Sequence, residues 1–317
     1  MKFSVALCTY NGEKYIEEQL NSILNQSVPV DEIIICDDNS KDSTIVLAER
    51  ILKNSGISYR IMVNDPPLGV AGNFLKALKH TTGDYVFTCD QDDIWHEDKV
   101  QVFANAIHES QKLLYFSDGY LVDGEAKSLG SSLWEAFGVE KELASGEAFL
   151  PILIRRPMVT GAAMTVSRTL IDQIDTIPEL WLHDEWFAMA AAVNDEIAPI
   201  MEKTFDYRQH GKNQVGAKKL NFRKKAEKWI SVLNILENFR AKNLKKKRDI
   251  VPLVIGTQYE AVAVEAVAFW SSLNDLPTLS FFKRLLLISR LYRIGAYSKY
   301  YTGIRGALRD VLSSFCR

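Results

Sequence analysis

Residues 32–40 have the sequence EIIICDDNS, in which three consecutive isoleucines precede a cysteine and two aspartates. A compact apolar run that ends in polar residues is typical of a β-strand buried on both faces. Residues 42–53 follow at once, with apolar side chains at helical spacing. This segment therefore predicts one strand and one helix of an α/β sheet whose two faces are both covered by helices.

The same strand-and-helix order extends on both sides of this segment. Apolar runs predict further strands and helical spacing predicts the helices between them, so the first half of the chain alternates regularly. This order predicts an α/β fold with a mostly parallel, Rossmann-like sheet and helices on both faces. The second half is less regular. The predicted strands are 3–8, 58–63, 85–89, 113–117, 159–166 and 198–207, and the predicted helices are 13–25, 70–80, 98–110 and 183–193.

Polar sequences follow three of the predicted strands: TYNG at 9–12, DDNS at 37–40 and DQDD at 90–93. In open α/β sheets, the carboxyl ends of parallel strands meet at one edge, and ligands bind there. We therefore expect these three segments to lie together and to form the functional site.

The strongest local signal is DQDD at 90–93, with three carboxylates in four residues. These charges repel one another, and a divalent cation would hold them together. Mg²⁺ and Mn²⁺ prefer carboxylate oxygens combined with substrate phosphates. A solvated turn with helix-capping aspartates explains the same residues equally well. The position of the cluster, directly after an apolar strand and before Ile94 and Trp95, favours a metal site.

The other two polar segments have weaker signals. One residue of 37–40 is expected to cap the following helix, and capping is the simpler explanation for that segment on its own. A second adjacent aspartate exceeds what capping requires, and it can accept a hydrogen bond from a nucleobase or a ribose. In 9–12, Tyr10 is placed to stack on a base, whereas Asn11-Gly12 is ordinary turn chemistry.

Size and composition are those of a globular protein. The chain has 317 residues, of which 47% are hydrophobic and 25% are charged. Its net charge of −2 conceals an asymmetry, because residues 212–317 hold 21 Lys+Arg and 7 Asp+Glu and so carry +14. The basic part is compatible with a solvated helical face, with attraction to anionic lipid or with nucleic acid. A nucleic-acid partner is not expected, since aromatic residues are not interleaved with basic ones in a recognisable binding motif.

Targeting signals are not recognisable. The first apolar stretch, 3–8, is too short for a signal peptide, and no run of about 18 apolar residues predicts a membrane span. The four cysteines lack metal-ligand spacing and are typical of small buried residues in a reducing compartment. We therefore expect a cytoplasmic protein.

Taken together, these motifs resemble the family 2 glycosyltransferases of the GT-A fold, in particular the bacterial polysaccharide and rhamnosyltransferase-like branch. The resemblance covers about residues 1–215, which implies a nucleotide-sugar-binding and catalytic domain there and a basic helical extension over 216–317. The order and spacing of the motifs are more specific than any one of them. The matching segments are 4–11, 35–44, 83–86, 90–95, 159–164, 183–186 and 207–211.

The resemblance implies an inverting glycosyltransferase of the hexosyltransferase type. Such an enzyme moves a sugar from a nucleotide-sugar donor to a hydroxyl group of a glycan acceptor in cell-surface polysaccharide synthesis. A dTDP- or UDP-sugar is the expected donor, a lipid-linked glycan is the expected acceptor, and rhamnose is one candidate for the transferred sugar. The expected cofactor is a divalent metal, Mn²⁺ or Mg²⁺.

The resemblance also implies roles for individual residues. Tyr10 and Asp38 would contact the nucleobase, with Thr9 lining the same pocket, and Asp90 would lie near the ribose. Asp92 would bind the metal on the diphosphate, and Asp184 matches the position of the catalytic base. The last two expected site residues are Arg208 and His210, which occupy a loop that closes over the diphosphate.

Several of these roles have alternatives. Asp184 would also be explained as a carboxylate favoured by a helix N-terminus. His210 is expected to bind the metal or to donate to phosphate, and His183 to support Asp184 or to contact the acceptor. Related enzymes often carry a basic residue where this chain has 69–73, so Arg208 and Lys212 are the candidates for meeting the phosphate charge. Three tryptophans form either a platform for the acceptor sugar or part of the core, namely Trp95, Trp181 and Trp186.

Two questions remain open at the level of sequence. The basic extension 216–317 is expected to dock on the membrane surface, to pack on the catalytic domain or to join a second subunit. The alternative functions are a sugar-phosphate nucleotidyltransferase and a non-catalytic protein that binds nucleotide sugar. The first lacks support because 9–13 has no glycine-rich loop with Arg or Lys, and the second is disfavoured by the intact aspartate set.

Overall fold

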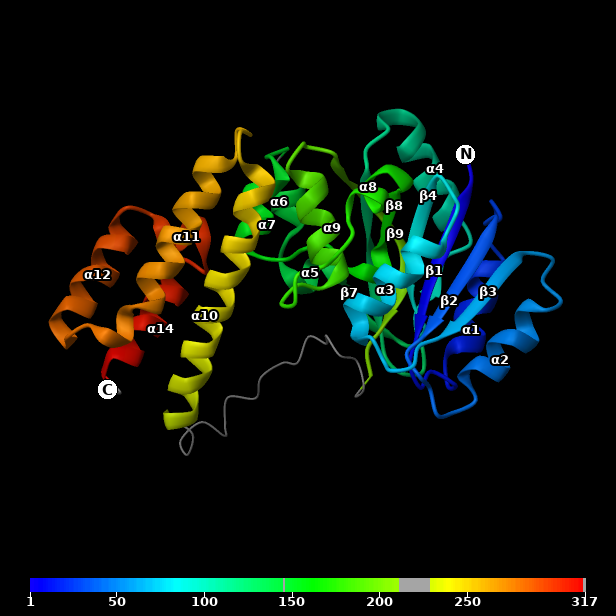
Figure 1. Cartoon of the computed structure of the whole chain (residues 1–317), viewed down its shortest axis with the longest axis horizontal. Coiled ribbons are helices and arrows are strands. Elements are labelled where there is room, and N and C mark those ends of the chain that lie inside the picture. Colours follow the sequence, from blue (N-terminus) through cyan, green and yellow to red (C-terminus); the bar gives the residue numbers. More distant parts are fainter. Residues whose placement is uncertain (145, 211–228, 316–317) are drawn as a thin grey trace. The chain divides into compact units, whose positions relative to one another are not determined.

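The structure is a computed structural model that describes residues 1–144, 146–210 and 229–315 (Figure 1). Two compact units are present. The first comprises Met1–Glu147 and Met158–Ala217, and the second comprises Ala148–Pro157 and Lys218–Arg317. The second unit therefore takes a short segment from the middle of the first. The expected domain boundary near residue 215 lies outside the described residues.

The described part of the first unit contains one nine-stranded sheet with the order β3-β2-β1-β4-β8-β6-β9-β5, in which β7 pairs with β6. The first four strands in this order are parallel to one another. Beyond β4 the sheet is mixed, because β8 is antiparallel to both β4 and β6, whereas β9 is parallel to β6. The strands are β1 (Phe3–Thr9), β2 (Glu32–Asp37), β3 (Ser58–Val63), β4 (Tyr85–Asp90), β5 (Ile94–Trp95), β6 (Leu114–Val122), β7 (Ser128–Ser132), β8 (Met164–Ser167) and β9 (Ile197–Arg208).

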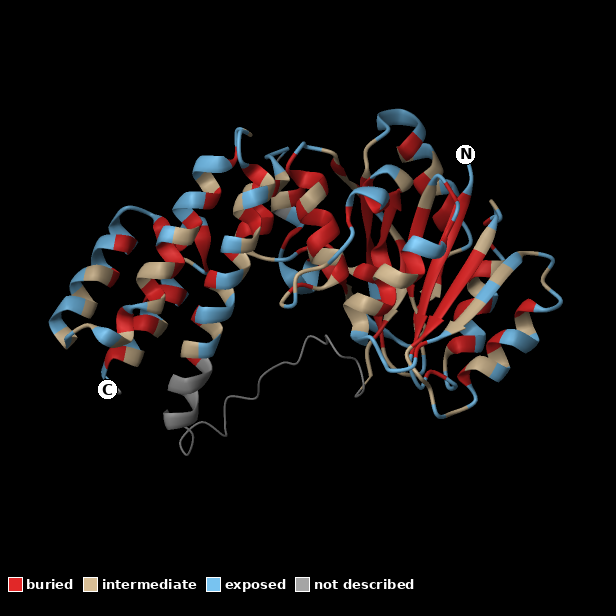
Figure 2. Cartoon of the chain, in the orientation of Figure 1, coloured by how far each residue is buried: buried red, intermediate tan, exposed pale blue. Residues whose placement is uncertain are grey.

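Helices cover the sheet as the alternating sequence predicts. The connections from β1 to β2 and from β2 to β3 run in one direction, and the connection from β3 to β4 runs back. Right-handed crossovers therefore place α1 and α2 on one face and α3 on the other (Figure 1). All seven residues of β1 are buried between these layers (Figure 2). The helices of this unit are α1 (Ile16–Leu24), α2 (Thr44–Leu52), α3 (Gly69–His80), α4 (Lys99–Ser110), α5 (Leu133–Phe137), α6 (Glu140–Leu143), α8 (Arg168–Gln173) and α9 (His183–Ala192).

The α/β fold class is confirmed, and one predicted strand is shorter than expected. The segment 159–166 was expected to be a strand interrupted at Gly161, and only its end belongs to β8, which starts at Met164. Gly161–Ala163 instead form a 3₁₀ turn, η1. The Thr88 hydroxyl donates to the Gly161 carbonyl, and the Gly161 amide donates to Asp184. These side-chain partners satisfy backbone groups that strand pairing would otherwise satisfy.

The second unit is helical, as expected for the basic extension. Its core is a cluster of aromatic rings in which Trp270 packs edge-to-face on both Phe239 and Tyr301, at centroid distances of 5.8 and 5.0 Å. No helix within the described residues is both long enough and apolar enough to cross a membrane. The elements of this unit are α7 (Phe149–Arg155), α10 (Trp229–Val254), α11 (Glu260–Asn274), η3 (Leu276–Thr278), α12 (Phe281–Arg293), α13 (Ala296–Tyr300) and α14 (Ile304–Phe315).

Candidate active site at the carboxyl ends of the strands

The three polar segments meet at one edge of the sheet, as predicted. In the register of the parallel strands, Thr9 is paired with Asp37, and Cys8 is paired with Asp90. Side chains then link the segments directly. The Tyr10 amide donates to Gln91 Oε1 at 2.8 Å, and Gln91 Nε2 donates back to the Tyr10 carbonyl at 3.0 Å. The position of these segments is therefore held by hydrogen bonds as well as by the strands.

Of the three residues expected to form the nucleobase pocket, one is exposed to solvent and two form hydrogen bonds with the protein. Tyr10 is 52% exposed and is free to stack on a planar ligand. The hydroxyl of Thr9 is buried and donates to Asp37 Oδ2 at 2.6 Å. The Thr9 side chain therefore supports the pocket from beneath instead of facing a ligand. Sequence reasoning overlooked this role of Asp37, since either of two adjacent aspartates explains capping equally well.

The Asp38 carboxylate, which was expected to contact the base, shapes the entrance of α3. Its Oδ1 accepts from the Leu68 amide at 2.6 Å, and its Oδ2 accepts from the Gly69 amide at 2.9 Å. Asn64 Nδ2 adds a third hydrogen bond to Oδ1 at 3.0 Å. Each carboxylate oxygen has more than one acceptor site, so Asp38 keeps the capacity to accept one donor from a ligand.

Four carboxylates, one buried and three half-buried, converge beside this pocket. Burial, together with the smaller effect of the negative charges of Asp92 and Asp184, raises the pKa of Asp90 to about 8. Burial also raises the pKa of Asp92, and it raises the pKa of Asp93 well above its usual range. Asp93 Oδ2 is buried and has no hydrogen-bond partner among the described residues. Carboxylates that lose their hydration and repel one another are stabilised by a bound cation.

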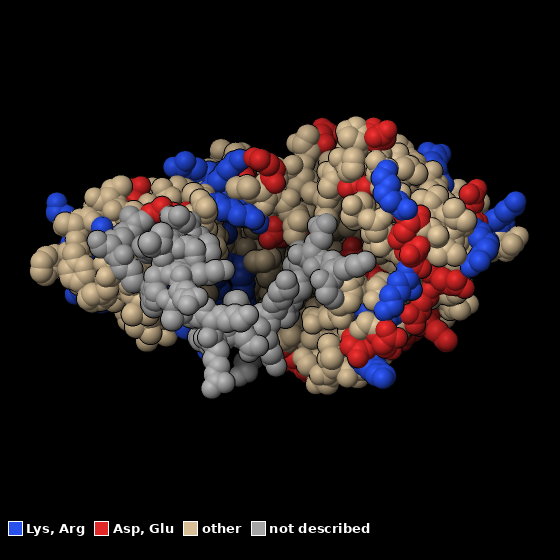
Figure 3. Space-filling model, turned by 90° about the horizontal axis from the view of Figure 1, so that it is seen from below, with Lys and Arg blue, Asp and Glu red and all other residues tan. Residues whose placement is uncertain are grey.

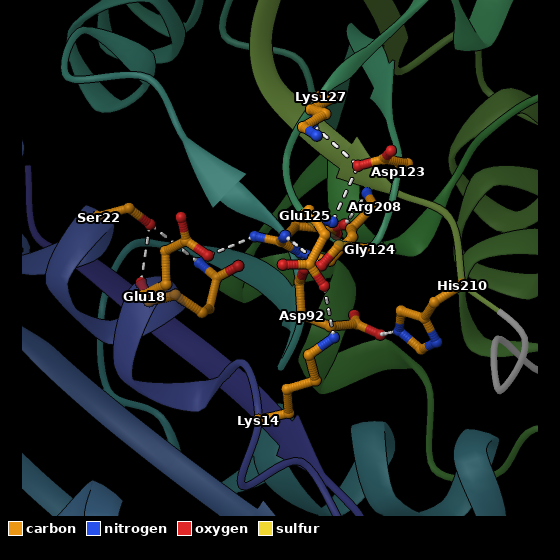
Figure 4. A network of polar contacts seen from close by, with 12 residues as sticks. Lys14, Glu18, Ser22, Asp92, Asp123, Gly124, Glu125, Lys127, Arg208 and His210 are labelled. Carbon is orange, nitrogen blue, oxygen red and sulfur yellow. Dashed lines mark hydrogen bonds and ion pairs between the residues drawn. The ribbon is translucent and has the colours of Figure 1, made fainter.

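Arg208 holds this acidic loop in place (Figure 4). Its backbone amide donates to Asp93 Oδ1 at 2.9 Å, and its Nε donates to the Asp92 carbonyl at 2.7 Å. Its Nη1 donates to the Gly124 carbonyl at 3.2 Å, and its Nη2 pairs with Glu18. These partners come from α1, from the loop after β4 and from the turn after β6.

This arrangement changes the interpretation of Arg208. Only 2% of the side chain is exposed, and its guanidinium is directed into the protein. The expected contact of Arg208 with the donor phosphates does not agree with this geometry, because the guanidinium is buried and its Nε, Nη1 and Nη2 already donate to protein acceptors. Arg208 is therefore better described as a positioning residue for the Asp92–Asp93 loop.

His210 contacts the acidic loop directly. Its Nε2 lies 2.7 Å from Asp92 Oδ2 (Figure 4). The ring stacks on Tyr15 with a centroid distance of 4.9 Å and an interplanar angle of 18°. The Arg208 guanidinium carbon also lies 4.9 Å from the Tyr15 ring, so Tyr15 supports both basic residues. Lys212, the other phosphate candidate, lies outside the described residues.

Asp184 is the second residue of α9, and it completes the carboxylate cluster. Its Oδ2 accepts from the Gly161 amide at 2.9 Å, and its Oδ1 accepts from the Glu185 amide at 2.8 Å. Burial raises the pKa of Asp184 to about 6, and the charge of Glu185 adds to this effect. A carboxylate with a pKa close to neutrality is suited to accept a proton.

His183 is a buried neutral side chain beside Asp184. Its ring stacks on Phe74 at a centroid distance of 3.7 Å, and both ring nitrogens lack a partner among the described residues. Burial lowers the pKa of His183 to about 3. A β-carbon on Gly161 would lie 2.5 Å from His183 Nε2, so the site requires a glycine there. His183 thus packs against the loop that orients Asp184, as the supporting role predicted.

Of the two roles expected for the three tryptophans, the structure shows the core role. Trp95, Trp181 and Trp186 are all buried, with no more than 8% of each residue exposed. Trp181 and Trp186 pack edge-to-face at a centroid distance of 5.2 Å. The three tryptophans belong to the core.

Comparison with known proteins shows similarity in both sequence and fold. The model of glycosyl transferase family 2 matches residues 4–172. A dTDP-rhamnosyl transferase of Shigella flexneri is 29% identical over 286 residues, which cover 83% of this chain and 93% of that protein.

Two solved structures share the fold. The crystal structure of Staphylococcus aureus TarS in complex with UDP-GlcNAc aligns with a TM-score of 0.63 at 18% identity, covering 100% of this chain and 90% of that one. A mannosyltransferase from Pyrobaculum calidifontis in complex with GDP-Man and Mn²⁺ aligns with a TM-score of 0.53 at 16% identity, covering 99% and 84%. Because the family model spans more than half of the chain, the chain belongs to glycosyl transferase family 2 and is a glycosyltransferase of the GT-A fold.

Proposed function

We propose that this glycosyltransferase moves a sugar, with inversion at the anomeric carbon, from a nucleotide-sugar donor to a hydroxyl group of a glycan in cell-surface polysaccharide synthesis. The observation that carries this proposal is the convergence of Asp90, Asp92 and Asp184 at the carboxyl ends of the strands. The nearly full-length similarity to a dTDP-rhamnosyl transferase supports a dTDP-sugar as the donor, with rhamnose as the transferred sugar. A UDP-sugar is the alternative donor.

The donor is proposed to bind across the first two polar segments. Tyr10 stacks on the base, Asp38 accepts a hydrogen bond from its edge, and Asp90 accepts from the ribose. The exposed ring of Tyr10 and the free acceptor capacity of Asp38 support this assignment. Thr9 acts indirectly, because its hydroxyl orients Asp37.

The cofactor is proposed to be Mn²⁺ or Mg²⁺, with Asp92 and His210 as its protein ligands. Their 2.7 Å contact places a carboxylate oxygen and an imidazole nitrogen side by side, and Mn²⁺ accepts both ligand types. No three His, Cys, Asp or Glu side chains within the described residues form a complete metal site, so the donor diphosphate and water would supply the remaining ligands. When bound, the metal would neutralise charge that develops on the leaving diphosphate. The Mn²⁺ in the structurally similar mannosyltransferase also supports this proposal.

Asp184 is proposed as the catalytic base that removes the proton from the acceptor hydroxyl. Hydrogen bonds from the Gly161 and Glu185 amides fix its carboxylate in orientation. Its raised pKa gives it the basicity for this transfer near neutral pH. Single displacement then requires no covalent intermediate, because the acceptor oxygen attacks the anomeric carbon from the side opposite the diphosphate.

The acceptor is proposed to be a lipid-linked glycan, which places the enzyme in the cytoplasm at the inner face of the cell membrane. The net charge of +14 over residues 212–317 supports association with that surface. Membership of glycosyl transferase family 2 favours transfer of a sugar over the two alternative functions, which are nucleotidyl transfer and binding without catalysis.

A thermal-shift screen tests this function. The purified protein is heated with UDP, dTDP, GDP, CDP or ADP, each with and without Mn²⁺. A ligand present at about 100 times its dissociation constant should raise the free energy of unfolding by about 2.7 kcal/mol. A metal-dependent shift with dTDP or UDP, followed by release of that diphosphate during turnover, supports the proposal. A folded sample that shifts with none of the five nucleotides contradicts it.

A further inference from the structure

The last helix of the second unit, α14, buries small and polar residues and exposes large apolar ones. The residues that it buries are small or polar, namely Gly306, Ala307, Asp310 and Ser314. The large apolar residues lie on the opposite side and are exposed to solvent. With 100° of rotation per residue, positions 304, 308 and 315 fall within about 40° of one another. The exposed fractions are 58% for Ile304, 55% for Leu308 and 66% for Phe315.

Helix α12 carries exposed apolar residues as well. Its Phe282 and Leu286 are four residues apart, so they share one face, and they are 76% and 67% exposed. Figure 2 shows this helix buried on one side and exposed on the other. The two helices are joined by aromatic contacts, because Phe281 lies 5.1 Å from Phe315 and 5.6 Å from Phe282 between ring centroids. We call Phe282, Leu286, Ile304, Leu308 and Phe315 the apolar face.

The exposed charge of the segment that carries the apolar face is of one sign. Residues 276–317 contain eight Lys and Arg but a single acidic residue, Asp310. That residue is fully buried, and its Oδ1 accepts from Arg240 Nη2 at 2.6 Å. No exposed carboxylate from 276–315 therefore opposes an approaching anion. The exposed cations next to the apolar face are Lys283, Arg290, Arg293 and Arg305.

We propose that the apolar face binds the interface of an anionic lipid bilayer, with the apolar side chains at the acyl boundary and the flanking cations at the lipid phosphates. This proposal rests on the proposed function, in which the acceptor is held in the membrane. Exposed bulky apolar side chains ringed by Lys and Arg are the composition that interfacial helices use. A second copy of the chain fits less well, since a symmetric contact would bring two surfaces of the same positive charge together.

Vesicle sedimentation tests the proposal with the full chain. Vesicles of phosphatidylcholine alone are compared with vesicles that also contain phosphatidylglycerol. Wild-type protein should sediment with the second kind, and high salt should weaken this binding. The double variants Phe282→Ser/Leu308→Ser and Lys283→Glu/Arg290→Glu should each lower the partition coefficient by about tenfold or more.

Matched controls and a second readout keep the outcomes distinct. Val46→Ser removes an apolar side chain that is 69% exposed on α2, and Lys53→Glu reverses an exposed charge there; both should bind vesicles normally. All variants should retain the wild-type nucleotide-induced thermal shift, which reports on the donor site independently of lipid. Binding that is unchanged in both double variants overturns the proposal. The proposal is also overturned if the wild-type protein does not bind anionic vesicles but forms a dimer in analytical ultracentrifugation, and if Phe282→Ser/Leu308→Ser dissociates that dimer.

Discussion

Replacing Arg208 by methionine separates a positioning role from a direct phosphate contact. Methionine keeps much of the side-chain volume but removes every donor and the charge. The half-buried carbonyls of Asp92 and Gly124 then lose their partners, and Glu18 loses its ion pair. The loop that carries the proposed metal and ribose ligands is then no longer tied to α1 by this side chain.

The magnitude of this loss follows from the individual contacts. Hydrogen bonds from a charged donor contribute roughly 1.5–3 kcal/mol each when the acceptor is buried. The pair with Glu18 adds at most about 1 kcal/mol, since the Glu18 side chain is 51% exposed and solvent screens it. Allowing for the packing that methionine restores, we expect the free energy of unfolding to fall by about 3 kcal/mol. We also expect kcat/KM to fall about 100-fold, because a displacement of the loop by an ångström disturbs the reacting geometry.

Two measurements check this expectation. Urea unfolding followed by circular dichroism gives the change in stability, and release of nucleoside diphosphate from the donor gives kcat and KM separately. Glu18→Gln serves as the matched control, because it retains an acceptor for Nη2 and should cost less than about 1 kcal/mol.

The opposite pattern would refute the reasoning. If Arg208→Met is as stable as the wild type and raises only the KM for the donor, Arg208 contacts the donor phosphates and the buried network does not govern the loop. A variant that loses stability and kcat together agrees with positioning.

Four further predictions concern the carboxylate cluster and its support. Asp92→Asn should abolish the Mn²⁺-dependent part of the nucleotide thermal shift without destabilising the apoprotein, since it removes one of several repelling buried charges; a retained metal-dependent shift contradicts the ligand assignment. Asp184→Asn should keep donor binding, measured by the same thermal shift, and lose transfer, whereas loss of donor binding would show that the residue is not simply the base. In the wild type, kcat/KM should rise with pH through about 6, because the base acts only when deprotonated and burial raises its pKa to that value. A profile that stays flat between about pH 5 and 8, the range in which such a base titrates, argues against this role of Asp184. Gly161→Ala should lower the free energy of unfolding by about 1–3 kcal/mol in urea titrations, because its β-carbon would meet a ring held by Phe74, and a neutral result would mean that the His183 ring moves freely.

Much of this protein follows from the sequence because the determining signals are local. The isoleucines of 33–35 and the apolar runs like them predict strands, and the parallel strand order predicts that their polar ends meet. The link between Tyr10 and Gln91 agrees with that expectation. The contact between His210 and Asp92 was expected only through the resemblance to known glycosyltransferases, since no local pattern joins residues so far apart.

The tertiary structure alone decided which polar groups form hydrogen bonds within the protein and which are exposed to a ligand. Arg208 and Asp92 are 116 residues apart in the chain, and nothing near either residue predicts that the guanidinium is buried against the backbone of the loop. The turn that replaces the first part of the predicted strand 159–166 likewise depends on Thr88 and Asp184, which come from other elements. Helical spacing identifies the two faces of α14, but only packing shows that its small residues face inward and its large ones face outward. The physical reason is common to all three cases: periodicity is a property of a segment, whereas burial and hydrogen-bond partnership depend on what the rest of the chain brings beside it.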